Sequence, residues 1–289
     1  MPLETGEDSA LTFRCGDDWL VGVLSMPAAA PTKGVLIVVG GPQYRAGSHR
    51  QFTLLARSLA ANGIAALRFD YRGMGDSEGA QRGFDTVADD LRAAIDAFMK
   101  VVPGMQELVL WGLCDAASAI AMYAAGDARV GGVAMLNPWV RTTDGLARAT
   151  LKHYYRGRLL ERDFWRKLLG GRFDLMGSLK SMAKLARSAF RPGQLDHSNG
   201  SGAQQALPLP QRMLAGMQAF QGRVLVITSG ADLTAREFCD VGAATPAWKR
   251  LLAAPHVTRH QIDKADHTFS RREWRDQVAD WTCTWVLGK

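Results

Sequence analysis

The stretch that decides the fold is Leu108-Val109-Leu110-Trp111-Gly112-Leu113-Cys114-Asp115-Ala116, in which an apolar strand runs into a helix of small residues ending near Ala125. A sharp turn from strand to helix needs small residues two positions before and after its tip, and Gly112 and Ala116 meet that need. Such a turn lifts Cys114 above the sheet edge, with the Asp115 N–H at a helix N-terminus. Taken alone, Cys114 also fits a buried structural cysteine.

Short β-rich runs alternate with helical stretches on both sides of this unit. We expect further strands at Leu20–Met26, Val35–Val39, Ala65–Phe69, Val130–Asn137, Val224–Ser229 and Val257–Ile262. We expect helices at Phe52–Asn62, Phe84–Val102, Gln211–Gln221, from Ala235 onward, and at Arg271–Leu287. This alternation predicts an α/β protein with a parallel sheet covered by helices, and Leu20–Met26 reads as an early antiparallel strand.

The alternation stops after Asn137 and resumes only at Gln211. Between them, residues 141–191 read as helical and carry 13 basic and 4 acidic residues, and residues 192–210 have the Gly, Ser, Gln and Pro of a flexible connector. We therefore expect a core domain made of residues 1–138 and 211–289, interrupted by a basic helical cap insertion, residues 139–210, with a flexible exit loop.

Composition narrows the class of protein. The 289 residues are 22% charged and 47% hydrophobic, as in an ordinary globular protein. The net charge of +7 is unevenly spread, because residues 141–191 carry a net +9 and the rest of the chain sums to −2. The cysteines have no C-x-x-C spacing, which argues against a zinc site or a disulfide framework. Neither a signal peptide nor a run of 18 apolar residues is readable, so we expect a cytoplasmic protein. The four cysteines are Cys15, Cys114, Cys239 and Cys283.

Two more residues follow strands that should end at the same sheet edge as Cys114. Asp232 comes just after Val224–Ser229, and His267 comes just after Val257–Ile262. Parallel strands share one carboxyl edge, so the three side chains should meet there. The order of nucleophile, Asp and His along the chain is that of a hydrolytic catalytic triad.

The loop after Val35–Val39 offers a fourth feature. Gly40-Gly41-Pro42 follows that buried strand where a second oxyanion donor is needed, and Pro42 has no N–H to give. We therefore expect the N–H groups of Gly41 and Asp115 to form an oxyanion hole, although a plain Gly-Pro turn is the alternative.

Taken together, the motifs resemble those of the cysteine-type α/β-hydrolases encoded with exosortase A systems, the first of the two hydrolase types named for that association. The resemblance rests on Asp70-Tyr71-Arg72-Gly73-Met74-Gly75-Asp76-Ser77, Gly40-Gly41-Pro42-Gln43-Tyr44-Arg45 and Gly112-Leu113-Cys114-Asp115. It implies an α/β-hydrolase fold with a mostly parallel eight-stranded sheet, and Cys114, Asp232 and His267 as nucleophile, acid and base. Cys replaces the commoner Ser, and Val39 replaces the His often found before the oxyanion glycine.

Residues near the predicted site have alternative roles. Gln43, Arg45, His49 and Arg50 could bind an anionic substrate group, or could form a solvated face. We expect residues 70–77 to shape a structural turn beside the site. Asp115 and Asp266 adjoin the triad, but we expect their side chains to point elsewhere, which leaves them as reserve acids.

No metal or cofactor is expected. His256 and His260 would lie about 13 Å apart along a strand, too far to share an ion. The chain has no G-x-x-x-x-G-K-[ST] loop, and the Cys114 turn lacks the G-x-G-x-x-G pattern of dinucleotide binding.

The insertion contains an amphipathic basic helix, with an apolar face of Leu175, Leu179, Met182, Ala186 and Phe190 and a basic face of Lys180, Lys184, Arg187 and Arg191. Its apolar face either covers the site as a cap or docks transiently on an anionic membrane or acidic glycan. No nucleic-acid-binding motif accompanies the charge.

The reaction expected is hydrolysis of carboxylic esters or thioesters through a covalent acyl-enzyme. The alternatives are acyl transfer to a sugar or lipid acceptor in exopolysaccharide metabolism, and a catalytically silent hydrolase fold that only binds. The sequence leaves the acyl group and the oligomeric state open.

Overall fold

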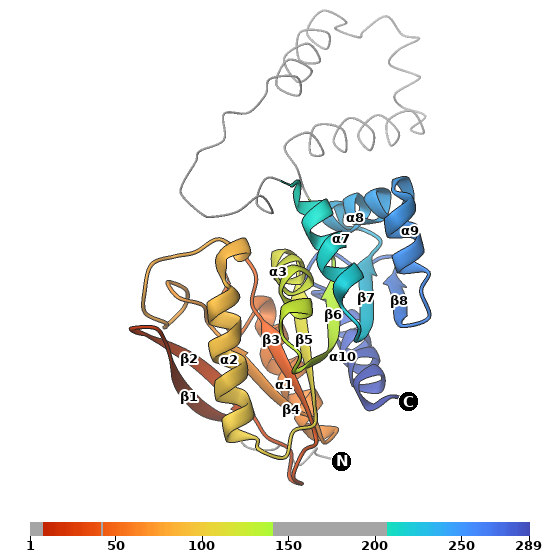
Figure 1. Ribbon diagram of the computed structural model, residues 1–289. Coiled ribbons are helices and arrows are strands. Elements are labelled where there is room, and N and C mark those ends of the chain that lie inside the picture. Colours follow the sequence, from red (N-terminus) through yellow and green to blue (C-terminus); the bar gives the residue numbers. More distant parts are fainter. Residues whose placement is uncertain (1–7, 42, 141–206) are drawn as a thin grey trace, which may run out of the picture. The chain divides into compact units, whose positions relative to one another are not determined.

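The structure is a computed structural model, and it describes residues 8–41, 43–140 and 207–289 (Figure 1). The chain divides into two units, residues 1–140 with 210–289, and residues 141–209. The basic helix and the connector of the predicted insertion lie outside the described residues, as does Pro42.

The first unit is built on an eight-stranded sheet, with strand order β1-β2-β4-β3-β5-β6-β7-β8. β1 pairs antiparallel with β2, β2 pairs antiparallel with β4, and all other neighbours are parallel. The α/β fold with a mostly parallel sheet is therefore confirmed. The strands are β1 (Asp8–Cys15), β2 (Asp18–Ser25), β3 (Lys33–Val38), β4 (Ala65–Phe69), β5 (Glu107–Leu113), β6 (Val130–Leu136), β7 (Arg223–Ser229) and β8 (Val257–Ile262).

Helices cover both faces of this sheet (Figure 1). They are α1 (Gln51–Ala61), α2 (Ala88–Val101), α3 (Asp115–Tyr123), α7 (Leu209–Ala219), α8 (Leu233–Ala244), α9 (Pro246–Leu252) and α10 (Arg272–Leu287), with short 3-10 turns at Ser48–Arg50, Phe84–Thr86 and Ala124–Gly126. In the described parts of the chain, every helix is too short or too polar to span a bilayer.

Successive residues of β3 contact the helices on opposite faces of the sheet. Val35 and Ile37 are fully buried in one cluster with Phe52 of α1 and Val286 of α10. On the opposite face, a Cβ at Gly34 would meet Phe98 of α2 at 3.1 Å. Successive strand residues point to opposite faces, so one strand holds both helical layers in place.

The elements differ from expectation in three places. β1 was not among the strands expected from the sequence. The helix expected over Phe84–Val102 is a 3-10 turn followed by α2, and the one expected from Ala235 is two helices, α8 and α9. Pro246 opens α9 and lacks an N–H, so it cannot continue the ladder of α8.

The loop over residues 70–77 is held by buried ion pairs. The Arg72 guanidinium donates two hydrogen bonds to Asp90 of α2, from Nε at 3.0 Å and from Nη2 at 2.9 Å. The backbone N–H of Arg72 donates a third hydrogen bond to Asp90 at 2.9 Å. Asp90 is fully buried and Arg72 nearly so. The expected structural role of this loop agrees with these contacts, because Arg72 faces Asp90.

We expect Asp90→Ala to lower the free energy of unfolding by about 3–5 kcal/mol, because it leaves the Arg72 guanidinium buried without its main carboxylate. Urea unfolding of both proteins measures the change. Asp89→Ala is the matched control, since Asp89 is exposed and lies 3.8 Å from Arg72. Equal losses in the two variants would contradict this account of the loop.

Candidate active site

The turn at Cys114 has the strained backbone that its position requires. Cys114 lies between β5 and α3 with φ of 62° and ψ of −123°, a conformation rare outside glycine. Its N–H donates to the Leu136 carbonyl at 2.9 Å, and its carbonyl accepts from the Trp139 N–H at 3.1 Å. A Cβ at Gly112 would lie 2.8 Å from the Ala116 carbonyl carbon, so only glycine fits there. The half-buried Cys114 side chain is thereby fixed at the sheet edge.

Asp232 and His267 meet at the same edge. Asp232 precedes α8 as its N-cap, and its Oδ2 accepts from the Ala235 N–H at 2.9 Å. The same oxygen lies 2.9 Å from His267 Nδ1. Burial opposes ionisation of Asp232, but the hydrogen bonds from His267 and Ala235 outweigh it and lower the pKa of this carboxyl. The carboxylate is therefore charged and directed at the imidazole.

His267 is held in its protonated form by two neighbours. Hydrogen bonds to Asp232 and then to Cys114 raise the pKa of His267 to about 10, against the opposing effect of burial. With Nδ1 on Asp232, Nε2 is the ring nitrogen left to meet sulfur. The structure thus brings together Cys114, His267 and Asp232, the three residues predicted as a triad.

Asn137 and Ser229, which the sequence analysis did not single out, tie the His267 loop to the sheet. Asn137 is fully buried, and its Nδ2 donates to Ser229 Oγ at 2.8 Å and to the His267 carbonyl at 2.9 Å. Ser229 Oγ donates to the Asp266 carbonyl at 2.8 Å, and its N–H donates to Asn137 Oδ1 at 2.8 Å. Both residues lie at or just beyond the end of a buried strand, the signal by which Asp232 was found.

Asp266 belongs to a local turn. It accepts hydrogen bonds from the Ser270 hydroxyl and, at 2.9 Å, from the Ser270 N–H. Although burial opposes it, these bonds lower the pKa of Asp266. The side chain is thus directed at Ser270, as expected of a residue that points away from the triad.

The Gly41 N–H, a predicted oxyanion donor, already has a hydrogen-bond acceptor within the protein. The Gly41 N–H donates to Asp115 Oδ2 at 2.9 Å, so the Asp115 side chain points into the oxyanion loop. The expectation that this side chain points elsewhere is wrong. Burial raises the pKa of Asp115, against the effect of the Gly41, Ala116 and Asp115 amides and the charge of His267. A side chain directly after the turn residue reaches back to the neighbouring loop.

Of the four residues predicted to contact substrate, Gln43 contacts its own loop and Arg45 binds the neighbouring loop over residues 70–77. Gln43 Oε1 accepts from the Ser48 N–H at 3.2 Å, and the Arg45 guanidinium pairs with Asp70 and Asp76. His49 and Arg50 are exposed and have positive φ angles of 51° and 59°. Only His49 and Arg50 thus remain open to an anionic group.

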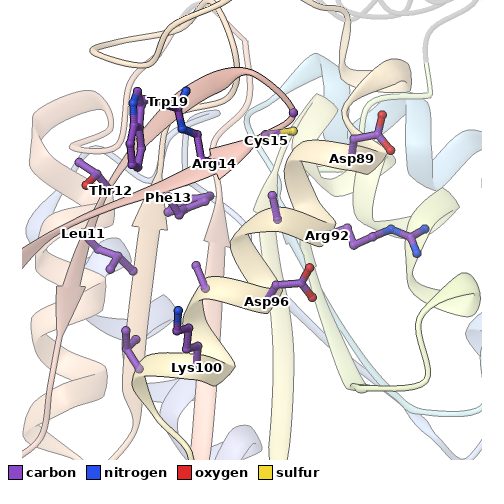
Figure 2. Close-up of a pocket in the computed structure, with 14 residues that line it drawn as sticks. Leu11, Thr12, Phe13, Arg14, Cys15, Trp19, Asp89, Arg92, Asp96 and Lys100 are labelled. Carbon is purple, nitrogen blue, oxygen red and sulfur yellow. The ribbon is translucent and has the colours of Figure 1, made fainter.

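No group of three metal-ligating side chains gathers within residues 8–41, 43–140 and 207–289. A surface groove of about 720 Å³ lies away from the triad, between β1 and α2 (Figure 2). Arg14, Trp19, Asp96 and Lys100 line it, and none of the triad residues does. The groove is therefore separate from the candidate active site.

Solved structures with this fold include esterases. The chain is similar to the esterase Pf2001 of Pyrococcus furiosus (16% identity, TM-score 0.63, covering 97% of this chain and 94% of that one). It is also similar to a thermostable carboxyl esterase of Bacillus coagulans (15%, 0.61, 98% and 98%) and to Est1E of Butyrivibrio proteoclasticus, solved with ferulic acid (17%, 0.63, 96% and 98%). At these identities the likeness shows the fold.

No curated protein matches the chain in sequence. The family model for Hydrolase_4, described as serine aminopeptidase S33, matches residues 30–269, a span that contains Cys114, Asp232 and His267. Cys114 lies in this span at the strand-to-helix turn, whereas the family's description names a serine enzyme. The chain therefore belongs to the serine aminopeptidase S33 family of α/β-hydrolases.

Proposed function

We propose that this α/β-hydrolase cleaves carboxylic esters or thioesters through a Cys114–His267–Asp232 triad and a covalent acyl-enzyme. The observation that carries the proposal is the 2.9 Å contact between Asp232 Oδ2 and His267 Nδ1, on a histidine whose pKa is raised by Asp232 and then by Cys114. This is the geometry of a nucleophile, a base and the group that orients the base.

The first half of the reaction forms the acyl-enzyme. Cys114 attacks as the thiolate, its proton carried on His267 Nε2, so that the sulfur bonds to the substrate carbonyl carbon and the π electrons of the carbonyl move to the carbonyl oxygen. The tetrahedral intermediate then collapses and expels the alcohol or thiol, which takes its proton from His267 Nε2. The charge of Asp232 stabilises the imidazolium that supplies this proton.

The second half releases the acid. His267 Nε2 takes a proton from water as its oxygen attacks the thioester carbon, and Cys114 leaves as thiolate. The Asp115 N–H at the start of α3 and the Gly41 N–H are the proposed donors to both oxyanions. An acceptor hydroxyl in the place of water would give acyl transfer by the same steps.

A substrate panel tests the proposed class. We expect p-nitrophenyl esters and acyl thioesters of increasing chain length to turn over, with the free acid as product. Aminoacyl p-nitroanilides form the peptide-bond arm, because the family is described as an aminopeptidase. A new ester product in the presence of a sugar or lipid alcohol would mean acyl transfer. Turnover of the anilides alone would overturn the ester assignment.

We expect Cys114→Ala to reduce kcat by about 10³-fold or more while the protein stays folded, because the substitution removes only the nucleophile. Cys114→Ser should also fall well below the wild type, since a hydroxyl needs stronger base assistance than a thiol. Steady-state rates, with circular dichroism for the fold, measure both. Undiminished turnover in the alanine variant would refute the mechanism.

We expect Asp232→Asn to reduce kcat by about 10²–10⁴-fold and Asp266→Asn much less. The pH profile adds a second readout. Because Asp232 raises the pKa of His267, the alkaline limb of kcat/KM should lie near pH 10 in the wild type and at lower pH in Asp232→Asn. A limb that stays in place would mean that Asp232 does not act on His267. A severe loss in Asp266→Asn beside a mild one in Asp232→Asn would reassign the acid.

We expect Asn137→Ala to lower kcat by about tenfold, because the His267 carbonyl loses the amide that ties its loop to β7. Thr228→Ala is the matched control, since Thr228 is a buried polar residue of β7 whose hydroxyl contacts a backbone carbonyl of β8. Rates normalised to the folded fraction separate positioning from stability. A normalised rate equal to the wild type would exclude the positioning role.

A further inference from the structure

The N–H expected to stabilise the reaction's negative charge already has a partner within the protein. Asp115 Oδ2 lies 2.9 Å from the Gly41 nitrogen, at hydrogen-bond distance. A backbone amide has one hydrogen to donate, so this bond and a bond to an oxyanion exclude each other. The carboxylate also carries the charge that the oxyanion would carry.

The fit between Asp115 and the oxyanion loop is tight. A Cβ at Gly40 would lie 2.2 Å from Asp115 Oδ1, so the carboxylate sits directly against the glycine backbone. Oδ1 itself is buried and has no hydrogen-bond partner among the described residues. A buried acceptor without a partner is destabilised relative to a hydrated one, which offsets part of the stabilisation that the carboxylate gains from the Gly41, Ala116 and Asp115 amides.

We propose that the Asp115 carboxylate is a built-in occupant of the oxyanion hole, which the substrate carbonyl must displace from Gly41 before Cys114 can react. The proposal rests on the function proposed above and adds a residue that controls substrate choice. Asp115 is thus a gating residue that competes with the oxyanion for one donor.

The charged and polar groups around Asp115 allow such an exchange. The charge of His267 favours the carboxylate. Burial, and then the charges of Asp115 and Asp90, raise the pKa of Tyr71, whose buried hydroxyl has no partner among the described residues. The Tyr71 hydroxyl is thus a buried donor within electrostatic range of Asp115, and the resting position of the carboxylate leaves it unused.

Competition for Gly41 has a consequence for selectivity. A substrate that binds through its acyl chain can use that binding energy to move Asp115, whereas a small ester with few contacts cannot. Removing the carboxylate should then help poor substrates and small oxyanion mimics more than well-bound substrates.

Two reagents separate the oxyanion hole from the nucleophile. Butanal adds to the Cys114 thiol as a hemithioacetal, in which a C–S bond forms and the aldehyde oxygen takes the oxyanion position. Iodoacetamide alkylates the same sulfur, with loss of iodide, and forms no oxyanion. We expect Asp115→Ala to bind butanal about tenfold more tightly and to change the alkylation rate by less than about threefold. Asp115→Asn should fall between, because a neutral amide oxygen is the weaker acceptor.

Controls make the outcome specific. Asp263→Ala removes an exposed carboxylate from the loop that leads to His267 and should leave the affinity for butanal at the wild-type value. Butanal binding that is unchanged or weaker in both Asp115 variants, with normal alkylation of Cys114, would overturn this inference alone and assign Asp115 to holding the loop. A wild-type protein whose Cys114 reacts with neither reagent would overturn the proposed nucleophile, and the inference with it.

Discussion

The structure depends on one constrained residue, Cys114, whose positive φ places its side chain above the sheet. That conformation costs about 1–3 kcal/mol and persists because neighbouring backbone groups enforce it. β6 accepts the Cys114 N–H through Leu136, and Gly112 lets α3 pack directly on β5. The pairing of the central strands thus keeps Cys114 in its strained conformation. Because these strands are parallel, they also bring Asp232 and His267 to the same edge of the sheet.

Two carboxylates with opposite effects border this cysteine. Asp232 is hydrogen-bonded to His267 and favours the imidazolium that the chemistry needs. The carboxylate of Asp115, the first residue of α3, accepts from Gly41 of the oxyanion loop, where its charge opposes the charge of the proposed oxyanion. Catalysis depends on interactions that strengthen in the transition state. In this account Asp232 supplies one such interaction, with the imidazolium of His267. The oxyanion hole supplies a second only after the Asp115 carboxylate has moved away from Gly41.

The local sequence pattern predicts the buried strands and the residues that follow them, because these depend on neighbouring residues in the chain. Buried parallel strands such as Val35–Val38 are continuous apolar runs, so they can be predicted without coordinates. The residues of the proposed triad follow strand ends, so their meeting at one sheet edge can be predicted as well. The pattern does not predict β1 because it is an edge strand, and five of its eight residues are exposed, including Asp8 and Ser9. The partners of Arg45, Asp70 and Asp76, lie 25 and 31 residues away along the chain, so the local pattern leaves Arg45 open to a substrate contact or a solvated face. Asn137 was missed because its amide bonds span 92 and 130 residues.

The central claim, that an acyl group is carried on Cys114, can be tested by intact-protein and peptide mass spectrometry after rapid acid quench during turnover of a p-nitrophenyl ester. The account predicts one added acyl mass in the wild type, located on the peptide that contains Cys114, and its loss in Cys114→Ala. An acyl group carried on a different residue, or turnover with no adduct while the substrate is saturating and deacylation limits the rate, would contradict it.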